Sequence, residues 1–504
     1  MREIDRRQVL ALAAGGALTA FTGVPLAGGG TAAAEPGEPA PVTVLSGATV
    51  IDGTGAPPLS GATVVLAGDR ILAVGRFPDL PVPPPIRRIE LAGKFIIPGL
   101  WDMHTHQAPA EQIFPPLYIA YGVTGIREMW GFAQTHEVRR KADRGELIGP
   151  RMVIAGSIID GPPAKWPGSA VVSTEAEARA EVRRSRSDGA DFVKVYSMLT
   201  RETFAAIADE ASKLGLPFAG HVPHRIPVGE AVGLGQHTVE HLYGMQLSTS
   251  ARAPELYAEI ATMSMDPADP AGFPARRDRL EAEAAATYDP ARAAALFDQM
   301  IRRGSWQSPT LSVLRRLVTG FVVGPDDPAS REMLRYMPKW MSQFWQLSVD
   351  PLSAEQQETR RQNFDARLRL IAAMEAAGVG IVAGTDAGNP FVFPGYSLHE
   401  ELELLVRAGL SPLRALQAAT RDAARCVGLE HVSGTVEVGK QADLVVLDAN
   451  PLDAIGNTRR IHAVITRGRY LSPQDRARIL SDVETAAQQQ ADIPFGGGVG
   501  GCCG

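Results

Sequence analysis

The sequence GLWDMHTH, residues 99–106, decides how the rest of the chain is interpreted. His104 and His106 stand two positions apart, just after a short apolar run. Side chains of a strand alternate between its two faces, so both imidazoles are expected on the same face. Such a pair can bind one metal ion or can be part of an ordinary core. Further ligand types at comparable positions would decide between these two interpretations.

Around this stretch, from about residue 98 to residue 428, short apolar runs alternate with helical patterns. Six of the runs are typical of buried strands: GVTGIREM, RMVIAGSII, DFVKVY, PFAGHV, HTVEHL and VGIVAGTDAG. Strands that alternate with helices predict an α/β fold with a parallel sheet. We expect a (β/α)8 TIM barrel, whose active site is built at the C-terminal ends of the strands. Residues 250–350 exceed one βα unit, and we expect extra helices there.

The two ends of the chain have a different pattern, with short β-rich runs broken by glycine turns. We expect these ends to pair into one small β-sandwich domain beside the barrel. The domain organisation predicted from the sequence has five parts: a signal peptide (1–34), the first part of the sandwich (35–97), the TIM barrel (98–428), the second part of the sandwich (429–475), and a C-terminal helix with a glycine-rich tail (476–504).

The N-terminus has the pattern of a targeting segment. Arg6 and Arg7 precede a weakly apolar stretch that ends in a small-residue site, where cleavage after Ala34 is expected. The paired arginines indicate a twin-arginine signal, and we therefore expect export to the periplasm or the exterior. A membrane anchor is the alternative, but the many Gly and Ala residues make the stretch poorly apolar, and no stable membrane insertion is expected.

Composition limits the partners. The chain has 504 residues, a formal net charge of −6 and 45 % hydrophobic residues, which gives no reason to expect nucleic acid as a partner. We expect a small-molecule substrate, and self-association is left open. The three cysteines, Cys426, Cys502 and Cys503, cannot form a disulfide framework or a Cys-rich zinc site, and we assign no role to the last two.

Four more residues of ligand type stand in or at the ends of predicted strands. Lys194 interrupts the apolar run DFVKVY, where an ammonium group is costly unless it is paired or modified. It can form a buried salt bridge, or it can react with CO₂ to give a carbamate that bridges two metal ions. His221, His241 and Asp386 end three later runs. A complete set at successive strand ends favours a metal centre, so His104 and His106 are interpreted as ligands.

This order of HxH, Lys, His, His and Asp resembles the amidohydrolase superfamily in its binuclear, carboxylated-lysine form. The resemblance runs through nearly all of the chain after the signal and includes GVTGIREM, GQHTVEHLYG and the long stretch from AGTDAGNP to ADLVVLD. That last stretch is similar to imidazolonepropionase-related amidohydrolases and to metal-dependent Xaa-Pro dipeptidases. The motifs are specific for the superfamily and its metal centre, and much less specific for the substrate.

The resemblance implies a ligand set. His104, His106 and Asp386 would hold the more buried of two divalent metal ions, and His221 and His241 would hold the more exposed one. Carboxylated Lys194 would bridge both. Zn²⁺ is the expected ion, because nitrogen and oxygen ligands suit it, although they also admit Mn²⁺ or Co²⁺.

The resemblance also implies a metal-dependent hydrolase that cleaves an amide or peptide bond with a metal-bridging hydroxide, and Asp386 would carry the proton. Dipeptides, Xaa-Pro peptides and N-acyl amino acids are the expected substrates. Tyr196, His224 and Tyr243 are candidate substrate contacts, since they lie two or three residues beyond ligand positions. For each of them, ordinary packing or a solvated loop is an equal alternative.

Three other functions remain in competition. A hydrolase of cyclic amides or lactones, like imidazolonepropionase, would use the same centre. A mononuclear deaminase usually has no lysine in the strand, so Lys194 argues against it. A metal-binding or solute-binding module without turnover would be expected to lack a ligand or Asp386.

Overall fold

The computed structural model describes residues 42–76, 86–106, 110–264, 272–322, 327–347, 349 and 352–489. The predicted signal peptide and the glycine-rich tail with Cys502 and Cys503 lie outside the described residues. The domain boundaries given above therefore stay predictions, although the fold class can be compared directly with the structure.

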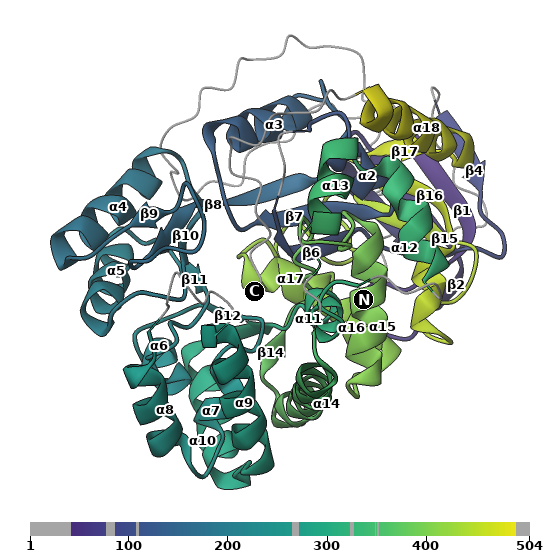
Figure 1. The fold of residues 1–504 in the computed structure, drawn as a ribbon. Helices are drawn as coiled ribbons and strands as arrows, with labels where there is room; N and C mark the ends of the chain where they lie inside the picture. Colours follow the sequence, from purple (N-terminus) through teal and green to yellow (C-terminus); the bar gives the residue numbers. More distant parts are fainter. Residues whose placement is uncertain are drawn as a thin grey trace.

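A curled parallel sheet forms the centre of the molecule and, with the surrounding helices, the predicted TIM barrel (Figure 1). Its eight strands follow one another in space in chain order: β6 (Leu100–Thr105), β7 (Val123–Glu128), β8 (Arg151–Asp160), β10 (Phe192–Val195), β11 (Phe218–Gly220), β12 (Thr238–Glu240), β13 (Trp306–Ser308) and β14 (Gly380–Ile381). A two-residue strand, β9 (Ala170–Val171), pairs with β8 at one side.

Backbone hydrogen bonds between β6 and the segment after β14 close the circle. The Met103 amide donates to the Ala383 carbonyl over 2.9 Å, and the Asp386 amide donates to the His104 carbonyl over 2.8 Å. Gly384 permits this approach, because a Cβ atom there would lie 2.9 Å from the backbone nitrogen of His104 and 2.6 Å from the hydroxyl of Ser308. The closure brings the last strand end directly against the first.

Helices surround the sheet, and their apolar faces form one large core with the strands. Between β6 and β12 they are α2 (Phe114–Ala120), α3 (Ala133–Asp143), α4 (Glu175–Ser187), α5 (Arg201–Lys213) and α6 (Val228–Gly233). After β14 they are α15 (Tyr396–Arg407), α16 (Pro412–Ala418), α17 (Arg421–Cys426), the 3-10 helix η2 (Ile455–Arg459) and α18 (Pro473–Gln489). Among the described residues, no helix is both long enough and apolar enough to cross a membrane.

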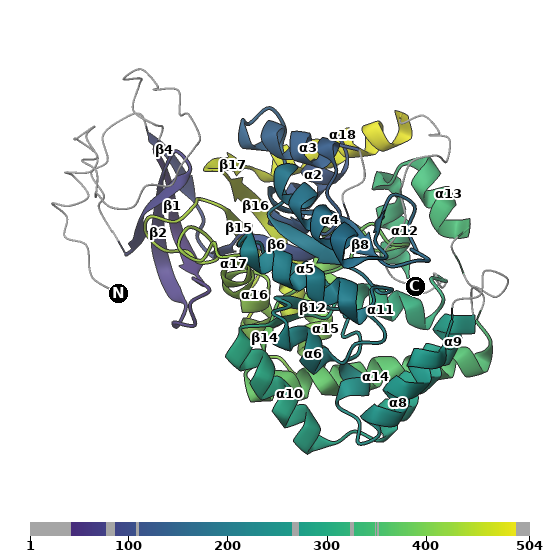
Figure 2. The ribbon, with the colours of Figure 1, turned by 90° about the vertical axis from the view of Figure 1, so that its left-hand side faces the viewer.

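The expected extra helices lie on both sides of β13. The helices α7 (Met245–Ser248), α8 (Ala253–Thr262), α9 (Gly272–Ala286) and α10 (Pro290–Arg303) precede that strand. It is followed by α11 (Leu311–Val318), α12 (Pro328–Met333), the 3-10 helix η1 (Leu334–Tyr336), α13 (Lys339–Leu347) and α14 (Ala354–Ala377). The helices α7 to α10 form a group at one end of the molecule (Figures 1 and 2).

A second sheet joins the two ends of the chain, as predicted. From one edge to the other its order is β17 (Arg469–Leu471), β16 (Ile461–Thr466), β15 (Leu444–Leu447), β5 (Phe95–Pro98), β1 (Val42–Val50), β2 (Leu59–Ala67) and β3 (Arg70–Gly75), with β4 (Ile86–Glu90) also paired to β1. The antiparallel pair β5–β15 connects the N-terminal part to the C-terminal part. One apolar cluster receives side chains from both parts and forms the core of this smaller unit, which lies beside the barrel in Figure 2.

Candidate metal centre and substrate site

The six predicted ligand residues all lie at the C-terminal ends of barrel strands. His104 is the second-last residue of β6 and His106 directly follows that strand, while Lys194 lies in β10. His221 and His241 directly follow β11 and β12. Asp386 follows β14 on the segment that closes the barrel. In a parallel barrel these ends meet on one face, which explains why residues so far apart in sequence come together.

The six side chains form one connected cluster. The Nζ atom of Lys194 lies 3.5 Å from Nε2 of His104, and Nε2 of His106 lies 3.1 Å from Oδ1 of Asp386. The His241 ring centroid lies 4.6 Å from that of His104 and 4.8 Å from that of His221. The structure therefore brings together every residue that the sequence predicted as a ligand, while their binding of metal stays a prediction.

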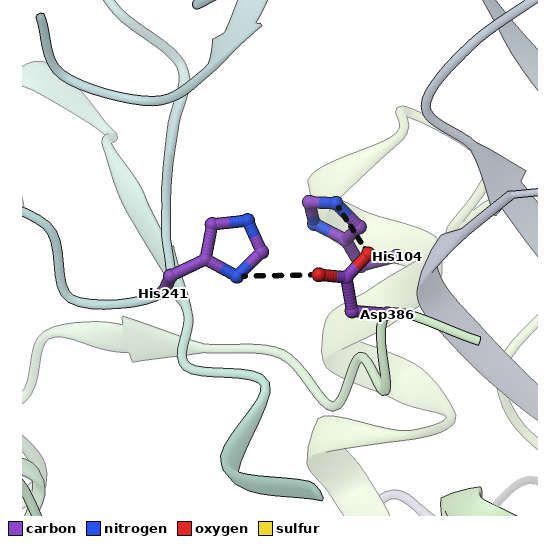
Figure 3. A group of neighbouring side chains, drawn as sticks. All are labelled: His104, His241 and Asp386. Atoms are coloured by element: carbon purple, nitrogen blue, oxygen red, sulfur yellow. Dashed lines mark ion pairs between the residues drawn. The ribbon is translucent and has the colours of Figure 1, made fainter. Parts of the chain in front are cut away.

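His104, His241 and Asp386 stand closest to a metal-binding arrangement. One donor atom from each lies within 4.8 Å of the other two, and all three residues are buried. Figure 3 shows the carboxylate of Asp386 between the two imidazoles. Its oxygens lie 3.5 Å from Nε2 of His104 and 3.9 Å from Nδ1 of His241.

A buried carboxylate fixes the orientation of His104. The Oε2 atom of Glu240 lies 2.7 Å from Nδ1 of His104, and Oε1 accepts a hydrogen bond from Arg127 over 2.7 Å. Burial alone would raise the pKa of Glu240, but the charge of Arg127 and the hydrogen bond from His104 lower it well below the usual range. Because Glu240 is a carboxylate, it accepts the Nδ1 proton and directs the lone pair of Nε2 toward the cluster.

Hydroxyl groups hold the other two imidazoles in a comparable way. Oγ of Ser197 lies 2.7 Å from Nδ1 of His221, and Oγ1 of Thr310 lies 2.7 Å from Nδ1 of His241. The Thr310 hydroxyl donates to the carbonyl of Pro309, so it can accept the Nδ1 proton of His241. Side chains outside the cluster therefore position three of its four imidazoles through Nδ1.

Burial keeps these histidines neutral. It lowers the pKa of His104 to about 4, with the charge of Lys194 acting in the same direction, and it lowers the pKa of His221 and of His241 well below the usual value. The pKa of Asp386 has other causes. Burial would raise its pKa, but its contacts with His104 and His106 lower it well below the usual range. The cluster therefore consists of neutral imidazoles around a carboxylate, which is the donor set that Zn²⁺ prefers.

The cluster also contains a buried donor atom that protein groups do not satisfy. Among the described residues, Nε2 of His221 is buried and has no hydrogen-bond partner. Leaving such an atom unsatisfied costs about 1–3 kcal/mol. A bound ion would supply the partner, so the residues present fit a metal centre.

The backbone at the site adopts conformations that are uncommon for residues with side chains. His241, Thr310 and Asp386 have φ values of 59°, 51° and 65°. Such left-handed conformations cost energy in residues other than glycine, and they often mark functional positions. Here they turn the side chains that follow β12, β13 and β14 back toward the cluster.

The predicted substrate contacts border the same cluster. Tyr196 stacks on His221 with ring centroids 4.0 Å apart, and its hydroxyl accepts a hydrogen bond from the indole of Trp166 over 2.9 Å. Tyr243 lies edge-on to His221 at 4.7 Å, and the centroid of His224 is 6.4 Å from that of Tyr243. All three thus lie near the ligand residues, and the loop with Trp166 covers Tyr196.

Several supporting residues were not predicted from the sequence. Glu240 and Asp102 are fully buried carboxylates next to ligand positions, and Asp102 accepts hydrogen bonds from the amides of His104 and Thr385. Burial raises the pKa of Asp102 to about 7. Both share one sequence feature, an acidic residue inside an apolar run within two positions of a histidine, but this feature does not show whether the carboxylate is buried. Ser197 and Thr310 carry no comparable signal.

Comparison with known proteins shows a family match over part of the chain and a shared fold over most of it. The model of the Amidohydrolase family matches residues 349–471. Imidazolonepropionase of Maricaulis maris is 39 % identical over 105 residues, which are 20 % of this chain and 26 % of the relative. Ochratoxinase of Aspergillus niger is 37 % identical over 93 residues, 18 % of each chain. The chain thus matches about a quarter or less of the length of these relatives.

Longer alignments are weaker in sequence but extend the likeness. Imidazolonepropionase of Rubrobacter xylanophilus is 26 % identical over 77 % of this chain and 85 % of its own. A solved Xaa-Pro dipeptidase with bound methionine has a TM-score of 0.61 at 20 % identity, covering 86 % of this chain and all of its own. Bottromycin amidohydrolase has a TM-score of 0.67 at 24 % identity, covering 88 % and 90 %. The predicted resemblance to amidohydrolases is thereby confirmed: residues 349–471 match the Amidohydrolase family model, and the fold is shared with solved dipeptidases and amidohydrolases.

Proposed function

We propose that this protein is a metal-dependent hydrolase that cleaves the amide or peptide bond of a small substrate, such as a dipeptide, an Xaa-Pro peptide or an N-acyl amino acid. The observation that carries the proposal is the strand-end cluster, in which four imidazoles, Lys194 and a carboxylate lie in one connected group. The name of the Xaa-Pro dipeptidase and the other names reported above support this reaction class.

In this proposal the cluster holds two divalent ions, with Zn²⁺ as the expected metal. His104, His106 and Asp386 would hold one ion, His221 and His241 would hold the other, and Lys194, as its carbamate, would be a ligand to both. When bound, such ions lower the pKa of a coordinated water and polarise a carbonyl group. The buried position of Lys194 beside His104 suits the carbamate, because the modification replaces a costly buried ammonium group by a ligand.

Asp386 is the proposed proton carrier. It is a carboxylate at neutral pH and lies inside the cluster, so it can accept the proton of the attacking water. The carboxylic acid that results can then protonate the nitrogen of the leaving amine, which completes cleavage of the C–N bond. A carboxylate held by His104 and His106 is restricted to one orientation, which favours transfer between fixed positions.

Tyr196, His224 and Tyr243 form the proposed substrate wall. Tyr196 and Tyr243 contact the ring of His221, and His224 lies next to Tyr243. We expect the Tyr196 hydroxyl, already fixed by Trp166, to donate its hydrogen to a substrate oxygen. The N-terminal sequence pattern adds the proposal that the enzyme works after export.

Opening of a cyclic amide or lactone is the second candidate reaction. The observation that favours it is the alignment with imidazolonepropionase over 77 % of this chain. The same cluster would serve either substrate type, because both reactions attack an acyl carbon. A mononuclear deaminase stays less favoured, since Lys194 lies within reach of His104.

Metal content and hydrolysis of purified protein test the proposal together. We expect about two Zn²⁺ ions per chain and release of amino acids from a library of dipeptides and N-acyl amino acids. Lys194→Ala should lose metal and activity, whereas the control Lys213→Ala, on the exposed end of α5, should keep both. One ion per chain with no change in Lys194→Ala would overturn the bridged centre. Turnover of cyclic amides alone would select the second candidate.

A further inference from the structure

A small pocket lies on the outer side of the substrate wall. His224, Tyr243, Gly244, Leu247, Arg277 and Glu281 are among the residues that line it. Arg277 comes from α9, one of the extra helices between β12 and β13, and not from a strand end. The pocket therefore joins the barrel rim to a part of the chain that the ligand motifs do not include.

Arg277 is the surplus cation of a buried group of charges. Around it lie two carboxylates and two further guanidinium groups. Asp278 is bound by Arg360 over 3.0 Å, and Glu281 is bound by Arg367. Arg277 lies farther from both carboxylates: its Nη2 atom is 3.6 Å from Oδ1 of Asp278, and its Nε atom is 3.9 Å from Oε1 of Glu281. The Nε atom is buried without a hydrogen-bond partner among the described residues. The group therefore contains three positive charges and two negative charges, so one positive charge is not neutralised.

The guanidinium group faces the site across a single ring. Its carbon lies 5.1 Å from the centroid of Tyr243, whose ring contacts His221 at 4.7 Å and His241 at 5.2 Å. Nearby charges reinforce the positive potential. Burial lowers the pKa of His224 well below its usual value, and the charges of Arg277, Lys165 and Arg225 lower it further.

We propose that Arg277 recognises an anionic group of the substrate, namely a carboxylate located close to the amide that is cleaved. This inference rests on the proposed function and names the substrate class within it: compounds with a free carboxylate, such as N-acyl amino acids and dipeptides. A guanidinium group suits this role, because its planar array of donors can bind a carboxylate through two parallel hydrogen bonds. A small anion in a buried positive pocket is also held more strongly than in water.

Extra helices then act as specificity elements. Helix α9 supplies the anion-binding residue, and Tyr243 sets its separation from the ligand cluster.

Paired compounds that differ only in this carboxylate test the proposal. N-benzoylglycine and several dipeptides are compared with their C-terminal amides, both as substrates and by calorimetric titration. We expect wild-type protein to prefer each acid over its amide. Arg277→Met should lower that preference by ~10–100-fold, mainly through KM, because a charge-assisted bidentate contact is lost. Arg277→Lys should keep part of it.

The control and the contradicting outcomes are well separated. Arg279→Met changes an exposed arginine on the same helix and should leave the preference unchanged. Equal handling of acids and amides by wild-type protein, or an unchanged preference in folded Arg277→Met, would overturn the role of Arg277. Acid-selective binding without hydrolysis of any pair would instead contradict the proposed function while leaving the anion site supported.

Discussion

The two sides of the ligand cluster are surrounded by different kinds of residues. On the β6–β14 side, the fully buried carboxylate of Glu240 holds His104, and closure of the barrel joins the segments that carry His104, His106 and Asp386. On the β11–β12 side, His221 is held by one hydroxyl and by stacked rings, and an added helix borders the pocket beyond it. We call these the inner side and the outer side.

This difference indicates that the two sides have different functions. Buried charges bind strongly only in one geometry, so the inner side suits a fixed centre and a fixed proton carrier. Aromatic surfaces and hydroxyls tolerate more than one arrangement, so the outer side suits a substrate that varies. Substitutions on the inner side should therefore affect metal and turnover, and those on the outer side should affect substrate choice.

The largest effect is expected at Asp386. Replacing it with asparagine removes both the proton acceptor and the negative charge between two imidazoles, so kcat/KM should fall by at least ~10³-fold. Product release under steady-state conditions measures the change, and circular dichroism checks the fold. Asp453→Asn, an exposed substitution far along the chain, serves as the control. A loss of tenfold or less would contradict the assignment of Asp386 as proton carrier.

Glu240→Gln should produce the next largest effect. Glutamine keeps the shape but cannot neutralise Arg127 or accept the Nδ1 proton of His104 as strongly, so Zn²⁺ affinity should fall by ~10–100-fold. Competition with a chromogenic chelator gives the affinity. Unchanged binding would show that the inner side does not depend on its buried charges.

His399 tests the effect of burial on a histidine that is not a proposed metal ligand. It is fully buried outside the cluster and contacts Thr458 and the carbonyl of Tyr121. Burial lowers its pKa to about 3, so it is neutral in the folded protein and protonated in the unfolded chain below about pH 6.5. Its contribution therefore favours unfolding as pH falls from 6.5 toward 3, by about 1.4 kcal/mol per pH unit.

Urea unfolding of His399→Gln at pH 6.5 and pH 5.0 measures this contribution. The free energy of unfolding should fall less steeply between these two pH values in the variant than in the wild-type protein, by about 1–2 kcal/mol. Equal slopes in the two proteins would mean that His399 does not stay neutral in the fold.

The smallest effect is expected on the outer side. Ser197→Ala removes the hydroxyl beside His221 but leaves its ring stacked on Tyr196, so Zn²⁺ affinity should fall only about two- to fivefold. The chelator competition used for Glu240→Gln gives a direct comparison. A loss as large as that of Glu240→Gln would remove the distinction between the two sides.

Sequence patterns predicted the barrel and the six ligand positions, because apolar runs that end in histidine, lysine or aspartate are uncommon. The strand β13 was missed, since Trp306–Ser308 is only three residues long and mostly polar. Glu240 was missed for another reason: a carboxylate next to a histidine looks the same whether it is buried or exposed. Arg277 could not be found, because its importance depends on which arginines pair with Asp278 and Glu281.

The pairing of β5 with β15 has a consequence for how the chain is made. Its two strands are separated by some 350 residues, and Ile97 lies opposite Val445. During synthesis the open edge of β5 must therefore wait until the whole barrel has emerged from the ribosome. Long-range pairing of this kind forms late, and an unpaired edge can recruit other chains. A chain that stops before β15 should thus aggregate, even though it already contains every residue of the cluster.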